Sequence, residues 1–432
     1  MSWTGHPSSP VNANTPGTLP DGDTPGTLPD GEKPAVEPAP AGPLPRSVGA
    51  LLRLLELTGA AGPPGWRRLL YACLLHALQT AAAYQTTAWS LRYGLQKLAA
   101  GVPAVRVVAD TAFFGVAFVL RWLTLSAVLL RGRRHFSAEL DRVRACLDQL
   151  SDLPGWAAPR RRTARIAAAL LAVMLALTVG IGWTTEGFIS PEICRSQHWS
   201  KCLLAWTRRV GYVGLVVSFQ LVPVKFLLVG LLISDGLETV NAELRAMVNG
   251  ERPAGAWQLQ RLARLRARLT DSFVRLTGDS AAELVLAMAN GMLLQVTLFM
   301  SVLETLRSAF TAQDVAGFAV YLMSTGLTLS GPCEAGQRAL QLSADSRRLL
   351  LQLEGRRPEL ASQAALLREA AAQDLDTLGD LGLFRLRRST IVSASSTILT
   401  YVIIMVQFSE AGGGGRDAAA AGSVSVTTAA LP

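Results

Sequence analysis

The chain has 432 residues, half of them hydrophobic and 17% charged, whereas a soluble globular protein has roughly 25% charged residues. The net charge is +9, which in a soluble protein would favour nucleic-acid binding. Seven long apolar runs exclude a soluble nucleic-acid-binding protein and predict a membrane protein. The five cysteines are scattered, the four histidines are not clustered, and no apolar run contains a pair of carboxylates. This composition predicts that the protein has no metal site and no cofactor and is not an enzyme.

Residues 1–45 have low complexity, and the octapeptide TPGTLPDG occurs at 15–22 and again at 24–31. This stretch contains too few large apolar residues to build a core, so it predicts a disordered cytosolic tail. A short amphipathic helix is expected just after it, near 48–57.

The remaining chain to residue 408 predicts one all-α domain with seven transmembrane helices. Backbone groups in lipid must bond internally, so each run is expected to be helical. Two runs contain a basic residue, Arg121 and Lys225, and snorkelling of both side chains to the cytosolic interface accounts for them. The seven runs are 69–91, 107–130, 166–188, 210–233, 284–306, 315–331 and 389–408.

Basic residues predict the topology, because Lys and Arg concentrate on the cytoplasmic side of membrane proteins. Of the 39 that lie outside the runs, 30 fall in the amino-terminal tail and the second, fourth and sixth loops. The amino terminus is therefore expected in the cytosol and, after seven crossings, the carboxyl terminus outside.

Two long connections, 234–282 and 336–388, predict helices that extend beyond the bilayer. In the first, Leu262, Leu265, Leu269, Phe273 and Leu276 recur at helical spacing between arginines. This pattern fits either a basic helix on the lipid surface or a helix packed against partner helices or other subunits. Under the second interpretation, the segments around 259–276 and 340–353 would hold an oligomer together.

The third loop is expected to face an oxidising space and contains Cys194 and Cys202. A disulfide between them is sterically plausible and would rigidify the loop, and the alternative is two free thiols. The other three cysteines, Cys73, Cys146 and Cys333, are interpreted as apolar filler.

The last run carries a specific motif, Thr400-Tyr401, then five apolar residues, then Gln407-Phe408. It resembles the TYhhhhhQF pattern that ends the last helix of the insect gustatory receptors, and the preceding stretch at 382–386 is similar to the segment that leads into that helix. The resemblance implies a tetrameric, ligand-gated cation channel, built from copies of one subunit or with related subunits.

In such a channel, four copies of helix 389–408 would line the pore. Thr400 and Gln407 are two turns apart and share one face, while Phe408 and Glu410 would form the constriction and the outer mouth. The alternative is that Gln407 bonds a neighbouring helix in its own subunit. The glycines at 412–415 are expected to end the helix, leaving 409–432 as a flexible external tail.

The resemblance also implies a small-molecule tastant bound among the helices before the last one, permeant cations, and a multi-pass location in the plasma membrane of a chemosensory neuron, surrounded by lipid. The candidate ligand-binding residues are Trp183, Glu304 and Tyr321. Trp89 and Tyr212 are interpreted instead as part of the interfacial aromatic belt.

Two other functions fit seven helices. A receptor coupled to G proteins requires an external amino terminus and usually a DRY-like triplet, and neither is predicted. A transporter would often show paired inverted repeats with broken helices, and no such repeat is evident.

Overall fold

The computed structural model describes residues 44–62, 65–101, 104–153, 156–184, 199–253, 255–305 and 312–423. Contacts between Cα atoms divide the chain into Met1–Ala41 and Gly42–Pro432, and every described residue belongs to the second unit. Most of the predicted tail at 1–45, and Cys194, lie outside the described residues. Over the described ranges the regular structure is helical, apart from one isolated bridge between Asp380 and Arg385.

Where the structure describes them, the seven apolar runs fall on helices, which confirms the all-α prediction. Within the described residues, four helical spans are long and apolar enough to cross a membrane: Gly115–Leu150, Arg160–Ile181, Ala205–Asn249 and Ala281–Phe299. The helices in chain order are α1 (Arg46–Leu57), α2 (Trp66–Ala99), α3 (Ala104–Ala127), the π-helical turn η1 (Val128–Gly132), α4 (Arg133–Leu150), α5 (Ala157–Thr184), α7 (Trp199–Asn249), α8 (Ala256–Asp279), α9 (Ala281–Thr305), α10 (Ala312–Arg356), the 3-10 turn η4 (Pro358–Leu360), α11 (Ala361–Thr377) and α12 (Arg388–Ser423).

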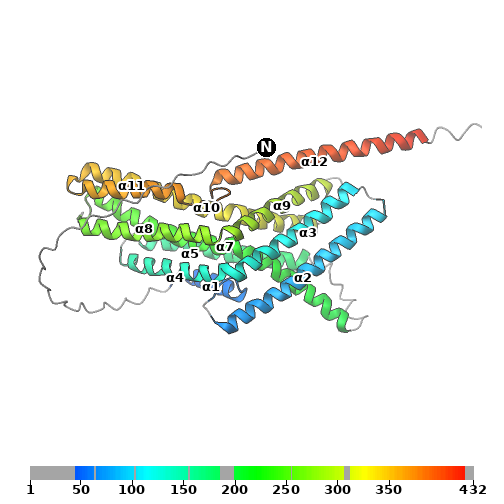
Figure 1. Cartoon of the computed structure of the whole chain (residues 1–432), viewed down its shortest axis with the longest axis horizontal. Helices are drawn as coiled ribbons and strands as arrows, with labels where there is room; N and C mark the ends of the chain where they lie inside the picture. The colour runs from blue at the N-terminus through cyan, green and yellow to red at the C-terminus, as the bar shows by residue number, and fades with distance from the viewer. Residues whose placement is uncertain are drawn as a thin grey trace, which may run out of the picture. The chain divides into compact units, whose positions relative to one another are not determined.

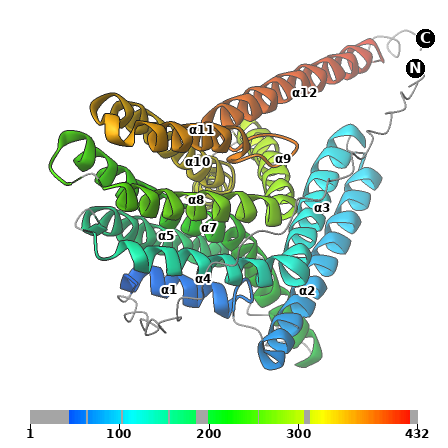
Figure 2. The ribbon, with the colours of Figure 1, turned by 60° about the vertical axis from the view of Figure 1, so that its left-hand side comes forward.

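Helix α7 is the central element of the fold (Figures 1 and 2). It packs against α2, α3, α4, α5, α8, α9 and α10, and nearly every side chain between Leu215 and Leu244 is buried. A helix that is apolar on all sides is stable where lipid or other helices cover it, and around α7 other helices do so. Pro223 removes one backbone hydrogen bond inside α7, and the packed neighbours hold the helix together across this point.

At one end of the molecule, α4, α8 and α11 gather around the carboxyl-terminal halves of α7 and α10, and we call this group the end bundle. Helix α8 contributes its apolar face: Leu265 and Leu269 are 2% and 0% exposed, and Leu262, Phe273 and Leu276 are also buried. The lipid-surface interpretation of this helix is therefore wrong. The same burial corrects the expectation that these leucines hold subunits together, because the chain's own helices already cover them.

The last helix is longer than expected. Helix α12 continues beyond Phe408 and through the glycines at 412–415 to Ser423, so the prediction that these glycines end the helix is wrong. Alanines at 411 and 418–421 flank the glycines, and alanine is the strongest helix former. Residues 424–432 lie outside the described part of the chain.

Candidate functional site

A buried arginine lies among aromatic side chains from three helices. The guanidinium carbon of Arg121 on α3 lies 5.5 Å from the ring centroid of Phe118 and 5.7 Å from that of Phe219 on α7. Tyr212 on α7 packs against Phe118, with ring centroids 5.6 Å apart, and Tyr321 on α10 interacts with both Tyr212 and Arg121. We call these five residues the Arg121 cluster.

The charge of Arg121 is not neutralised by any described side chain. The residue is 3% exposed, and its Nε atom is buried without a hydrogen-bond partner in the described ranges. No carboxylate of the described residues forms an ion pair with it. The two ring faces attract the guanidinium, but they do not satisfy its N–H donors. The cluster therefore combines an unsatisfied N–H donor with apolar rings, which suits an amphipathic small molecule that carries a hydrogen-bond acceptor.

Beside the cluster, a second set of polar groups connects α7 to α10. The amide of Gln220 donates to the Ser324 hydroxyl, and Thr328 donates to the Gln220 carbonyl oxygen over 3.3 Å. All three side chains are buried. These groups satisfy one another, so they hold the two helices together rather than offer bonds to a ligand.

The sequence singled out Trp183, Glu304 and Tyr321 as ligand-binding residues. Tyr321 lies in the Arg121 cluster, while the side chains of Trp183, on α5, and Glu304, on α9, lie outside what the structure describes. One sequence interpretation is wrong here, because Arg121 is buried rather than snorkelling to an interface. Tyr212 is half-buried against Phe118, and its place in an interfacial belt stays a prediction. A sequence signal was available, because Arg121 lies nine residues from the end of its run, about 14 Å along a helix.

Lys225 is likewise buried rather than snorkelling, which corrects its interpretation too. Its ammonium group on α7 forms an ion pair with the Glu283 carboxylate on α9, and the Phe136 ring lies 5.8 Å from the ammonium nitrogen. Glu283 begins α9 just before its apolar run, and its carboxylate occupies the space next to Gly132, where a Cβ atom would overlap it. The π-helical turn η1 ends at this glycine.

The last helix packs on one side only. Ile398 and Val402 are buried, at 3% and 5% exposed, where α12 contacts α9 and α10. Tyr401 is 60% exposed, and Thr400 and Gln407 are also exposed. The Thr400 hydroxyl donates back to the Ser396 carbonyl over 3.0 Å, which leaves no hydrogen bond from it to another helix. The exposed side of α12 also carries the large apolar residues Val392, Leu399, Ile403 and Ile404.

Two other predicted pore residues, Phe408 and Glu410, lie on α12 with side chains outside the described set. The structure does not bring Thr400, Tyr401 or Gln407 into the Arg121 cluster, because α12 does not pack against α3 or α7 within the contacts that define the fold.

The base of α12 is fixed to α10 in two ways. The Arg388 guanidinium donates to both carboxylate oxygens of Glu334, over 2.9 and 2.7 Å, and this bond lowers the pKa of the Glu334 carboxyl group. The segment before α12 also lies directly on α10: a Cβ atom at Gly336 would come within 2.5 Å of the Leu386 carbonyl oxygen. Helix α10 therefore carries Tyr321 of the Arg121 cluster and also the two contacts that position α12.

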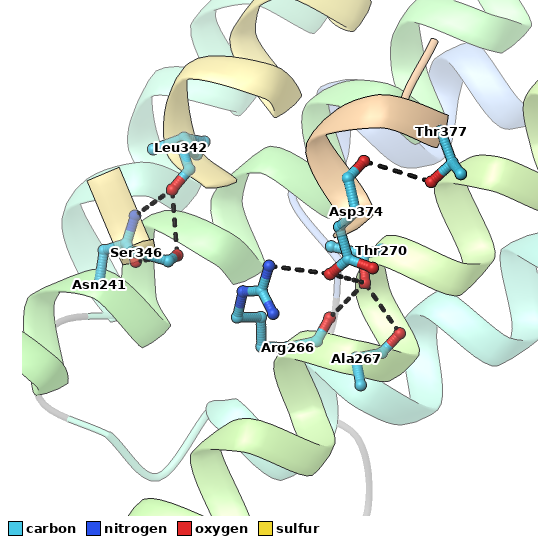
Figure 3. Close-up of polar contacts among 8 residues, drawn as sticks. All are labelled: Asn241, Arg266, Ala267, Thr270, Leu342, Ser346, Asp374 and Thr377. Carbon is cyan, nitrogen blue, oxygen red and sulfur yellow. Dashed lines mark hydrogen bonds and ion pairs between the residues drawn. The ribbon is translucent and has the colours of Figure 1, made fainter. Parts of the chain in front are cut away.

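Polar contacts join α8 to α11 and α7 to α10 within the end bundle (Figure 3). Arg266 on α8 donates to the Asp374 carboxylate on α11 over 2.8 Å, and Thr270 donates to the same oxygen over 3.3 Å. Burial lowers the pKa of Arg266, and the Asp374 charge opposes that shift. Across the bundle, Asn241 of α7 donates to the Leu342 carbonyl oxygen of α10 over 2.8 Å and accepts from Ser346 over 2.5 Å.

Of the two cysteines expected to pair, Cys202 lies near the start of α7 and is disulfide-bonded. Its expected partner, Cys194, lies outside the described residues, so the pairing of these two stays a prediction. Cys146 and Cys333 are buried free thiols, and Cys73 is a free thiol on the exposed side of α2.

Comparison with known proteins adds three findings. A sequence model described as 7tm chemosensory receptor matches residues 110–412. The solved structure of the insect olfactory receptor OR5 from Machilis hrabei is similar over 84% of this chain and 97% of its own, with a TM-score of 0.64 and 14% sequence identity. The structure of the same receptor in complex with eugenol has a TM-score of 0.60, with the same identity and coverage. No curated protein matches the chain by sequence.

Proposed function

The chain belongs to the 7tm chemosensory receptor family, and from this membership we propose that it is a gustatory receptor: a non-selective cation channel opened by a small-molecule tastant. The proposal places the tastant within the membrane helices, at the Arg121 cluster. The motif of the last helix favours the gustatory type over the olfactory type. A small organic ligand agrees with the fold relative OR5, whose structure has been solved in complex with eugenol.

The observation that carries the channel proposal is the one-sided packing of α12. A membrane helix has little reason to leave Thr400 and Gln407 uncovered unless that side meets water or another subunit. One helix cannot enclose a pore, so several copies must meet, and the family resemblance suggests four. In this tetramer Thr400, Tyr401, Gln407 and Phe408 would line the path, and Glu410 would attract cations at its outer mouth.

The contacts of α10 suggest how the ligand would open the pore. A ligand at the Arg121 cluster would touch Tyr321, and the same helix holds the base of α12 through Glu334 and Arg388. A displacement of α10 would therefore move the start of the pore helix. The proposal also includes a plasma-membrane location, a cytosolic amino terminus and an external carboxyl terminus.

The experiment is to express the chain alone in cells and record currents during application of a tastant panel. We expect ligand-evoked, non-selective cation current. Gln407→Ala and Phe408→Ala should change basal leak or gating, and Glu410→Lys should lower cation conductance. Surface labelling of each variant controls for expression. If no member of the panel evokes current in cells that carry the protein at their surface, or if both alanine variants gate and conduct like the parent, the proposed channel mechanism is wrong.

A further inference from the structure

We infer that the Arg121 cluster selects a ligand that carries one carboxylate group on an apolar body. The inference rests on the proposed function for the location of the ligand and goes beyond it by naming the ligand's chemical class. It starts from a charge that the described chain does not neutralise.

Removing a cation from water is costly, and a partner that restores the lost interactions must be present for the cost to be offset. Arg121 is 3% exposed, and its Nε atom has no partner in the described part of the chain. The nearby polar groups of Gln220, Ser324 and Thr328 bond one another and offer no carboxylate. A bound anion would supply the missing partner.

The geometry of the guanidinium group favours a planar anion. Its N–H donors form a fork that matches the two oxygens of a carboxylate. The hydroxyl groups of Tyr212 and Tyr321 bond each other, which leaves one further O–H donor near the same charge. Among the described residues the cluster contains a single positive charge, so a monoanion balances it, whereas a doubly charged phosphate group would leave a net negative charge in an apolar site.

The rest of the ligand should be apolar, because the aromatic rings of Phe118 and Phe219 flank the guanidinium group. Such rings bury hydrocarbon and offer no hydrogen bonds to sugar-like hydroxyl groups. A neutral polyol would leave the cation uncompensated. These contacts together specify a small aliphatic or aromatic carboxylic acid in its ionised form.

The test compares each acid with its own primary amide, which has nearly the same shape but no charge. Benzoate with benzamide, and hexanoate with hexanamide, are titrated against the purified full chain at pH 7, and binding is measured by thermal stabilisation. We expect the parent to bind the acids about tenfold or more tightly than the amides, as for a hydrogen bond to a charged group. Arg121→Gln should abolish this preference, and Arg121→Lys should retain part of it.

Arg131→Gln is the matched control, because it removes an equal charge from an exposed position near the end of the same apolar run. It should keep the full preference for acids. Arg121→Gln removes a buried charge without a described partner, so it should melt no lower than the parent. If Arg121→Gln nevertheless fails to fold, the test rests on Arg121→Lys alone, which should show a smaller preference for acids over amides than the parent.

The inference is overturned if the acids do not bind the parent, if acid and amide bind equally, or if Arg121→Gln keeps the preference. Because this assay measures binding, it separates the inference from the channel proposal. Acids that bind without evoking current would contradict the channel proposal alone. Current evoked by neutral tastants from a chain that does not bind the acids would contradict the inference alone.

Discussion

Lys225 on α7 and Glu283 on α9 form an ion pair in which the two side chains are only 1% and 2% exposed. Neither charged group has a further hydrogen-bond partner among the described residues. Each charge therefore depends on the other for compensation, and the pair connects the central helix of the fold to α9.

Removing one member of this pair should destabilise the fold more than removing both. Lys225→Met or Glu283→Gln leaves an uncompensated buried charge, which costs about 3–5 kcal/mol, whereas the double variant leaves none and should recover most of that loss. Apparent melting temperatures of the purified variants measure the difference. Arg275→Gln is the control, because it breaks the exposed Arg275–Asp271 pair and should shift the melting temperature little. Additive effects of the two buried substitutions would contradict this prediction.

The end bundle should respond in a graded way to substitutions of Asp374. Asp374→Ala leaves the buried guanidinium of Arg266 without its acceptor, and we expect a loss of about 2–3 kcal/mol, since Asp374 is itself 30% exposed. Asp374→Asn keeps an acceptor oxygen and should cost less. Asp345→Ala, which breaks the exposed Arg348–Asp345 pair, provides the baseline. Equal melting temperatures for all three variants would mean that the Arg266–Asp374 bond does not stabilise the bundle.

Assembly should depend on apolar residues that the single chain leaves exposed. Leu366 on α11 is 71% exposed and Leu351 on α10 is 55% exposed, both on the outer surface of the end bundle. We expect Leu366→Asp combined with Leu351→Asp to yield folded monomers, measured by size-exclusion chromatography with light scattering. Leu265→Asp, in contrast, should unfold the chain, because that side chain is buried. Normal tetramers in the Leu351/Leu366 variant would show that the subunit contacts lie elsewhere.

The exposed side of α12 should react with water-soluble thiol reagents if it lines a pore. Thr400→Cys and Gln407→Cys should lose current after external modification, and faster during ligand application. Ile398→Cys and Val402→Cys, on the buried side of the same helix, are the matched controls and should react slowly. Equal rates at all four positions would contradict a pore lined by this side of α12.

Features that depend on residues close together in the sequence could be predicted from the sequence alone. The seven apolar runs, the spacing of the leucines on α8 and the motif around Thr400 and Gln407 each depend on residues within a few turns of one another. These patterns predicted the helices and assigned the pore-lining role to the last helix. They could not predict which surface covers each helix, so the face of α8 was compatible with lipid, with another subunit or with the same chain.

The charged residues show the limit more clearly. Whether Lys225 snorkels or pairs depends on Glu283, which is distant in sequence and reaches it only through the packing of α7 against α9. The surroundings of Arg121 likewise include Phe219 and Tyr321, which belong to two other helices. One apolar run shows that it contains a charged residue, but it does not show which side chains of other helices contact that residue.

Gly336 is a position where side-chain size alone controls the distance between α10 and the segment that leads into α12. The atom nearest to an added Cβ there is the backbone oxygen of Leu386, which cannot rotate away as a flexible side chain could. Alanine at 336 would thus act as a wedge beneath the start of α12, far from both the Arg121 cluster and the motif around Gln407. If the proposed channel function holds, naturally occurring variants at this one position would change the resting current of the channel while leaving unchanged which compounds open it.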